Sequence, residues 1–250
     1  MDIGILFDIG LFAAVFLVNF FGAISGGAGL VVRPLLILLG VPPQFAIGTT
    51  RTANVITRLV GLTQFHKHSK IDWKLALTLM VPATVGSIIG VQLVVWLDQE
   101  LLTRIIGFMV LLSGIGLLIK KDVGIANIDF VPSVRRKIIG GIIYGLSTLI
   151  ATLSGGGGVI NNYILLNIYK KSYISAAAIR KVAGFGGAFI GSLLFIYYGF
   201  INWYYALLIL IAGSIGTYMG VQHGIKKGEE WVRVIVLIVV FVFGTKMLFF

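Results

Sequence analysis

The sequence contains no cysteine, which excludes disulfide bonds, thiolate nucleophiles and cysteine-ligated metals. Histidine is nearly as rare, with only His66, His68 and His223 present. A pair spaced i, i+2 does not share a helix face as the histidines of a helical zinc site do, so we expect no metal ion. No glycine run leads into the Gly-Lys-Ser/Thr of a phosphate loop, and none opens a βαβ unit. The sequence therefore predicts no cofactor.

Acidic residues are also scarce, at 9 Asp+Glu against 20 Lys+Arg, which leaves a formal charge of +11. Asp8 is the only carboxylate well inside an apolar segment, and it lies near one end, where we expect it to be hydrated. No general acid/base pair and no Ser/His/Asp set has plausible members. We therefore expect a protein that is not an enzyme.

Charged residues of both signs make up 12% of the chain, about half the share in a soluble domain, and apolar residues make up 58%. A mean hydropathy of +1.02 leaves no face polar enough for a basic nucleic-acid binder. The composition predicts a multi-pass protein of the cell (inner) membrane, with the lipid bilayer and not a nucleic acid as partner. The start, Met1-Asp2, has no basic n-region, so we expect no signal peptide.

The apolar segments fall into two length classes. Those long enough to cross a bilayer on about 20 residues are 3–24, 44–65, 74–96, 101–119, 138–153, 173–198, 203–223 and 231–249. The segments 29–40 and 159–169 are too short to cross alone, and each follows a glycine run, at residues 25–29 and 154–158. We interpret these two as half-helices after a backbone break. The predicted fold class is an all-α polytopic membrane protein.

The second glycine run follows the first by 129 residues, and other landmarks keep nearly the same offset. The matching pairs are Arg51 with Arg180 at 129, and Ile71-Asp72-Trp73 with Ile201-Asn202-Trp203, Gly86 with Gly216 and Gly90 with Gly220 at 130. The sequence therefore predicts two tandem repeats, residues 1–119 and 138–250, joined by a basic linker at 120–137. Each repeat would hold about four spanning helices and one half-helix.

Loop charges favour inverted repeats, in which equivalent loops lie on opposite sides and only the cytoplasmic copy is basic. The uncharged loops 41–44 and 199–202 correspond to basic loops at 170–171 and 67–74, and loop 98–104 sums to −1 where 226–233 sums to +1. With the linker inside, both termini would lie outside if each broken segment turns back as a hairpin. If the half-helices do not complete a crossing, the repeats become parallel.

The glycine runs give the strongest local signal for binding. Residues without Cβ permit unwound backbone at membrane depth, and a half-helix starting at Leu30 or Val159 adds its positive dipole end, which suits an anion. Close helix packing through glycine is the alternative, and we assign the small-xxx-small pairs Gly86/Gly90 and Gly216/Gly220 to it. The predicted substrate-binding residues of the two runs are Ser25, Gly26, Gly27, Gly29, Ser154, Gly155, Gly156 and Gly157.

Two arginines lie inside equivalent predicted helices. Arg51 and Arg180 are at a depth of about 10 Å, where an unpaired charge costs about 2.5–3.5 kcal/mol. Snorkelling to the headgroups is the alternative, but occurrence of the arginine in both halves favours substrate binding. Lys181 points about 100° away from Arg180 around the helix, and we expect it to snorkel.

Further candidates lie near the breaks. Arg33, one turn after the first break and before Pro34, could meet the same anion as Arg51, and Arg58 is a secondary candidate. The neutral donors Thr49, Thr50, Asn54, Asn161 and Asn162 complete the predicted substrate-binding set, with interhelical hydrogen bonding as the alternative for each.

Several motifs occur in the order of a known family. They are the glycine-rich break, Arg33-Pro34-Leu35, Gly40-Val41-Pro42-Pro43, Ala46-Ile47-Gly48-Thr49-Thr50 and Ile71-Asp72-Trp73. Together they resemble the sulfite exporter TauE/SafE family, over both halves and nearly the whole chain. The second half departs from the pattern, with Lys170-Lys171 in the proline turn and Ser175-Ala176-Ala177-Ala178 in place of Ala-x-Gly-Thr, so Arg180 rests on repeat alignment.

The resemblance implies a secondary transporter of small sulfur-containing anions such as sulfite, sulfoacetate or related sulfonates. Combined with the residues above, it predicts export by alternating access, with a small anion as substrate. The competing interpretation is an intramembrane enzyme acting on lipid headgroups, or a membrane assembly subunit, whose basic residues would bind phosphate at the lipid. Substrate identity, direction and oligomeric state stay open from sequence.

Overall fold

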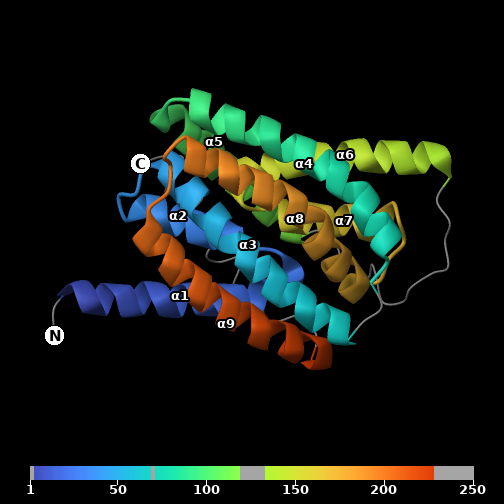
Figure 1. Cartoon of the computed structure of the whole chain (residues 1–250), viewed down its shortest axis with the longest axis horizontal. Coiled ribbons are helices and arrows are strands. Elements are labelled where there is room, and N and C mark those ends of the chain that lie inside the picture. The colour runs from blue at the N-terminus through green and yellow to red at the C-terminus, as the bar shows by residue number, and fades with distance from the viewer. Residues whose placement is uncertain (1–2, 69–70, 119–132, 228–250) are drawn as a thin grey trace.

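A computed structural model describes residues 3–68, 71–118 and 133–227, which form α-helices and no strand (Figure 1). Their bounds are α1 Ile3–Ser25, α2 Gly29–Leu38, α3 Pro43–His68, α4 Trp73–Trp96, α5 Gln99–Leu118, α6 Val134–Ser154, α7 Gly157–Asn167, α8 Tyr173–Tyr197 and α9 Trp203–Lys227. Shifting α1 to α4 by 129 or 130 residues reproduces α6 to α9 to within two residues at each boundary.

Helix lengths agree with the two classes predicted from hydropathy. Both half-helices form where predicted, as the 10-residue α2 and the 11-residue α7, each directly after its glycine run. Five helices of the described chain, α1, α4, α6, α8 and α9, are long and apolar enough to cross a membrane. The 26-residue α3 is longer than any of these five but less apolar, because it carries Arg51 and Arg58. The predicted segment 231–249 lies outside the described residues.

The helix ends gather at two opposite ends of the molecule. At one, Gln44 at the start of α3 donates to the carbonyl of Leu97 after α4 (3.1 Å), and Thr49 accepts from the N–H of Asn202 before α9 (2.9 Å). At the other, Lys171 before α8 forms an ion pair with Asp72 before α4, at 2.8 Å. We call these the acidic end and the basic end, after the charges that each carries.

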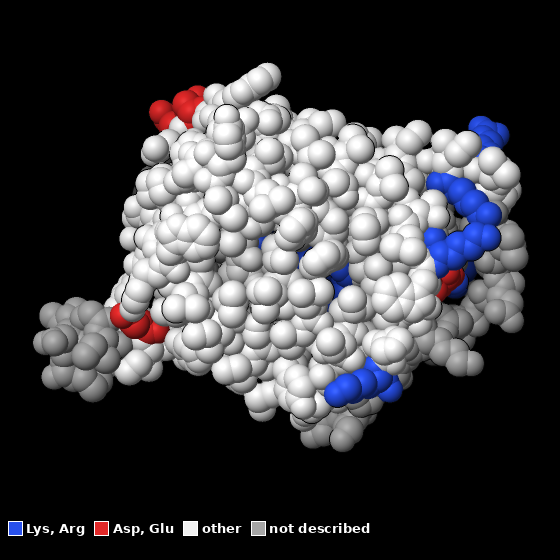
Figure 2. All heavy atoms as spheres, in the orientation of Figure 1, with Lys and Arg blue, Asp and Glu red and all other residues white. Residues whose placement is uncertain are grey.

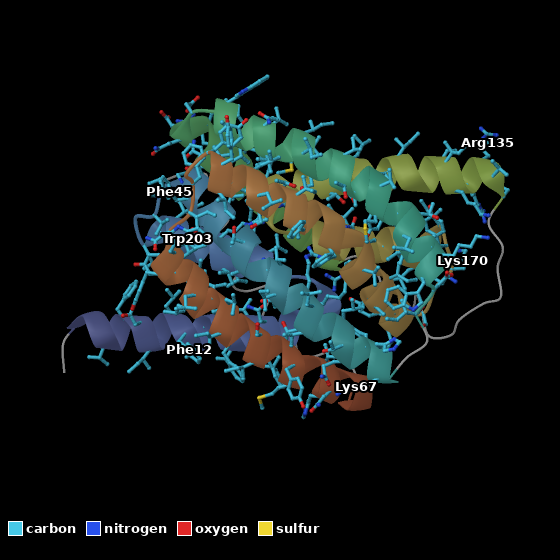
Figure 3. All side chains as sticks on the ribbon, viewed as in Figure 1. Phe12, Phe45, Lys67, Arg135, Lys170 and Trp203 are labelled. Atoms are coloured by element: carbon cyan, nitrogen blue, oxygen red, sulfur yellow. The ribbon has the colours of Figure 1, made fainter. Side chains whose placement is uncertain are left out.

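The charges differ sharply between the two ends (Figure 2). Described residues of the acidic end are Asp8, Asp98, Glu100 and Arg104, and those of the basic end are Lys67, Asp72, Lys74, Arg135, Arg136, Lys137, Lys170 and Lys171. Figure 3 shows three of the latter, Arg135 and Lys170 at the right-hand end and Lys67 at the lower right, with Phe45 and Trp203 at the left. All four carboxylates of the described chain therefore lie at an end and not in the interior.

Helix directions follow from these ends and are visible in Figure 1. Helix α1 begins at the acidic end and α2 returns to it, whereas α6 begins at the basic end and α7 returns there. Helices α3 and α9 run from the acidic to the basic end, and α4 and α8 run the opposite way. Each glycine break therefore reverses the chain as a hairpin. The expectation that both termini lie on the outside depended on this reversal.

The packing glycines hold the outer helices against the inner ones. Helix α6 packs on α4 and α1 packs on α9, while α3 and α8 cross in the centre. A Cβ on Gly86 or Gly90 would overlap α6 at Gly145, Leu149 and Thr152, and one on Gly216 or Gly220 would overlap α1 at Phe16 and Phe20. The assignment of both pairs to close packing is confirmed.

The duplicated Ile-Asp/Asn-Trp motif forms two equivalent helix caps. Asp72 accepts from the N–H of Leu75 (3.0 Å) at the start of α4, and Asn202 accepts from the N–H of Tyr205 (3.2 Å) at the start of α9. A side-chain oxygen at this position satisfies an amide that the first helical turn leaves unpaired. The motif thus caps the second helix of each long helical hairpin, α4 at the basic end and α9 at the acidic end.

Candidate anion site

The two glycine breaks touch each other in the middle of the molecule. Gly26 and Gly155, equivalent at an offset of 129, both have left-handed backbone, with φ of 85° and 80°. A Cβ on Gly26 would lie 2.7 Å from the carbonyl carbon of Gly158, and one on Gly29 would lie 2.6 Å from the carbonyl oxygen of Gly155. Only residues without Cβ permit both this backbone and this approach. The breaks therefore form one crossing and not two separate sites.

Both half-helices start at the crossing. Helix α2 follows Ala28 and α7 follows Gly156, and neither of these cap residues supplies a side-chain hydrogen bond. Ser154 donates to the carbonyl of Ile150 and accepts from the N–H of Gly156 at 3.1 Å. The positive ends of two helix dipoles thus lie beside one another. The side chain of Ser25 lies outside the described structure.

Arg180 lies against both breaks at once. Its guanidinium carbon would be 2.9 Å from a Cβ on Gly26, and its Nη1 would be 2.9 Å from one on Gly158. Its Nε donates to Asn162 of α7 at 3.0 Å, and the residue is 6% exposed. Snorkelling does not describe this side chain. The structure brings together Arg180, Asn162 and the two glycine runs.

Arg33 of α2 holds the end of α6. Its Nη1 donates to the carbonyls of Ala151 (3.0 Å), Thr152 (2.8 Å) and Leu153 (3.3 Å), and its Nε donates to Thr50 at 3.1 Å. The last carbonyls of a helix have no partner within the helix and form the negative end of its dipole. A buried guanidinium therefore stabilises the end of α6, and Arg33 has oxygen partners in the protein itself.

Arg51 of α3 connects three other helices. Its Nη1 donates to Thr152 of α6 at 3.0 Å, and its Nη2 donates to Ser87 of α4 and to the carbonyl of Gly187 of α8, at 2.9 Å for the latter. The residue is 7% exposed. Its Nε is buried without a hydrogen-bond partner among the described residues. Arg51 is thus bonded chiefly to hydroxyl and carbonyl oxygens.

Three of the predicted neutral residues lie apart from the crossing or bond elsewhere. Thr49 is fully buried but accepts from Asn202 at the acidic end, and Asn161 accepts from Ser147 of α6. Asn54 lies one turn beyond Arg51 along α3 and is partly buried. Interhelical hydrogen bonding describes Thr49 and Asn161.

Two further cations lie in the interior. Lys181 is 7% exposed, with its Nζ 2.9 Å from the position of a Cβ on Gly61, so the expected snorkelling is wrong. Arg58, which is partly buried, crosses from α3 to lie against Gly184 of α8. Position gave a signal only for Arg58, which is near the middle of a long helix, too far from an end for its side chain to reach the headgroups easily.

The interior cations act on one another without a carboxylate between them. Arg58 is electrostatically coupled to Arg33, Arg51, Arg180 and Lys181, and each coupling is repulsive. The described carboxylates all lie at the two ends. Isolated buried charge is costly unless it is paired, because the interior cannot replace its hydration. A group of five basic residues with this surplus of positive charge is suited to a bound anion.

Comparison with known proteins identifies the family. The sulfite exporter TauE/SafE family matches residues 11–247. The chain belongs to this family. A relative from Haemophilus influenzae, named "Probable membrane transporter protein", is 25% identical over 100% of this chain and 97% of its own length. Another relative, "Probable membrane transporter protein YdhB" from Bacillus subtilis, is 27% identical over 85% of this chain and 86% of its own length.

The TauE/SafE assignment confirms the resemblance seen in the sequence. The family is one of membrane transporters, and the five long, apolar helices of the described chain agree with a multi-pass membrane protein. No solved structure was found to match the chain.

Proposed function

We propose that the protein carries small sulfur-containing anions, such as sulfite, sulfoacetate or related sulfonates, out of the cell by alternating access. The observation that carries this proposal is the group of buried basic residues around the glycine crossing, with no carboxylate among them in the described chain. A lipid-headgroup enzyme would instead need basic residues that face the bilayer. Arg33, Arg51, Arg180 and Lys181 are each at most 7% exposed, which favours a substrate within the bundle.

The proposal includes an inverted repeat with units 1–119 and 138–250. It is supported by the opposite directions of equivalent helices and by the equivalent packing of α6 on α4 and α1 on α9. Two halves of the same fold in opposite orientations can exchange their conformations, which opens a central site to one side and then to the other. The buried arginines of the described conformation lie closed to both sides.

The charge difference between the ends supports the orientation. Basic loops favour the cytoplasmic side, so the basic end would lie inside and the start of α1 outside. An inside-negative potential then contributes about 2.3 kcal/mol per charge per 100 mV, or about 4.6 kcal/mol for a departing dianion. Export of a dianion therefore requires no coupling ion.

Sulfite flux from proteoliposomes tests the proposal, with Arg51→Ala and Arg180→Ala as the variants. Removing a buried positive charge, together with the Nε of Arg51 that has no described partner, weakens anion binding and lowers flux by about 10-fold or more in each variant. Arg104→Ala is the matched control, because Arg104 pairs with Glu100 at the exposed acidic end (2.5 Å) and leaves the crossing unchanged. Each variant must keep the monodisperse elution of the parent. Undiminished flux in both interior variants contradicts the site.

A further inference from the structure

The interface of α3 and α8 places two cations in a reciprocal arrangement. Arg58 of α3 lies against Gly184 of α8, and Lys181 of α8 lies against Gly61 of α3, with its Nζ 2.9 Å from the position of a Cβ there. On each helix the glycine follows the cation by three residues, or about one turn. Each helix therefore presents one positive side chain and makes room for that of its neighbour.

Polar groups of this region are buried without partners. The Nε of Arg58 and the hydroxyl of Tyr144 are both inaccessible and have no hydrogen-bond partner among the described residues. Tyr144 is fully buried, belongs to the apolar cluster that includes Ile179 and Val182 of α8, and experiences the charges of Arg58 and Arg180. Buried donors are almost always satisfied in folded proteins, so two of them beside surplus positive charge indicate a missing acceptor.

Arg33 and Arg51, which lie nearer the acidic end than Arg58, have a different set of partners. Arg33 and Arg51 donate to carbonyl and hydroxyl oxygens of other helices. Arg58 lies seven residues beyond Arg51 on α3, about 10 Å further toward the basic end. There the protein supplies cations and donors but, in its described part, no carboxylate.

We propose that Arg58 of α3, Lys181 of α8 and Tyr144, which α6 contributes, form a second anion-binding station on the basic-end side of the glycine crossing. Two cations and a hydroxyl donor suit a doubly charged oxyanion with several acceptor oxygens. The station rests on the proposed transport function and extends it, because an anion coming from the basic end would meet this pair before it reached Arg51. Tyr144 is then a specificity-determining donor.

Binding of sulfite to the purified full-length protein tests the station, with Tyr144→Phe as the main variant. The substitution removes only a hydroxyl that has no protein partner, so the melting temperature without anion stays at the parent value. The sulfite Kd, read from calorimetry in mildly alkaline buffer where sulfite is doubly charged, rises about 10-fold or more. Lys181→Met raises it at least as much.

Tyr169→Phe is the matched control. Tyr169 belongs to the same apolar cluster as Tyr144, but its hydroxyl donates to the carbonyl of Lys137 at the basic end, at 3.3 Å. This variant loses some stability and keeps the parent Kd for sulfite. Parent-like Kd values in both Tyr144→Phe and Lys181→Met overturn the station, and transport still stands if Arg51→Ala and Arg180→Ala lose flux. Absence of both sulfite binding and sulfite flux in the parent protein overturns the proposed function itself.

Discussion

Arg51 and Arg58 lie two turns apart on the same helix, Arg51 buried and Arg58 partly buried, and their contacts with neighbouring helices differ. Arg51 donates to oxygens of α4, α6 and α8, so it connects helices. Arg58 lies against Gly184 of α8, and although the Nε of each arginine is buried without a described partner, only Arg51 has the oxygen partners at Nη1 and Nη2 given above. Charge and position on a central helix are therefore insufficient to distinguish an arginine that also stabilises the fold from one whose described contacts give it no such role. The distinction comes from where each donor finds its acceptor.

The largest expected effect compares Arg51→Met with Arg58→Met. Loss of three hydrogen bonds from a charged donor lowers the free energy of unfolding of the Arg51 variant by about 2–4 kcal/mol. Arg58→Met removes a repelled charge with an unsatisfied donor, so it is neutral or stabilising. Thermal unfolding without anion measures both. Equal losses in the free energy of unfolding of the two variants would contradict the different roles assigned to Arg51 and Arg58.

A glycine pair on α8 sharpens the same contrast with smaller effects. A Cβ on Gly191 would overlap the Nε of Arg51, and one on Gly184 would overlap the Nη1 of Arg58. Gly191→Ala displaces a bonded guanidinium and costs about 1–3 kcal/mol. Gly184→Ala displaces the guanidinium of Arg58, which can move more freely, so the free energy of unfolding changes less while the affinity for sulfite falls. Melting temperature and Kd, measured on both variants, separate these outcomes.

Gly10→Ala controls for the substitution itself, because a Cβ there meets nothing within 4 Å. We expect it to leave sulfite affinity unchanged. A drop in affinity with Gly10→Ala as large as that with Gly184→Ala would show that the assay does not report on the α3 and α8 interface.

The smallest expected effect concerns an ion pair at the basic end, in which Lys171 contacts the carboxylate of Asp72. Burial raises the pKa of Asp72, but hydrogen bonds from Lys171 and the N–H of Leu75, with the nearby lysine charges, lower it more, so the net pKa lies below its ordinary value. A lowered folded-state pKa contributes stability above the unfolded pKa, and this is lost as pH falls through the folded one. The partly exposed pair contributes less than about 1 kcal/mol.

Asp72→Asn isolates that ion pair, because asparagine keeps the helix cap, as Asn202 does in the equivalent position. We expect the variant to lose the part of the acid-induced destabilisation below about pH 4 that comes from Asp72. Melting temperatures across acidic pH check this. An unchanged acid profile in Asp72→Asn contradicts a role for the pair in stability.

Much of the local structure was predictable from residue types. The half-helices followed from short apolar segments after glycine runs, and the packing role of Gly86 and Gly216 from small-xxx-small spacing. Burial of Lys181 was not predictable in the same way. Helical periodicity places a side chain around its own axis, but whether it reaches the headgroups depends on the neighbouring helices that surround it. Here Gly61 of α3 and Thr217 of α9 lie beside it.

Some residues of the candidate site were likewise predictable from the sequence, and others were not. Arg180 and Asn162 were expected near a break and lie there. Thr49 was expected there too, but its hydroxyl accepts a hydrogen bond at the acidic end, because Thr49 lies near the start of α3 at that end. Tyr144 had no sequence signal, since a tyrosine in an apolar helix is ordinary until its hydroxyl is known to lack a partner.

The sequence by itself determined the membrane class, the broken helices, the duplicated landmarks and the presence of cations at depth. These depend on hydropathy, backbone freedom and spacing, which are local properties of the chain. Only the tertiary structure decided which cations share an environment. Arg58 and Lys181 are 123 residues apart in the chain and lie close only because α3 and α8 cross. That crossing gives the Nη atoms of Arg51 oxygen partners in the protein and places Arg58 against Gly184, where we propose that an anion supplies the oxygen.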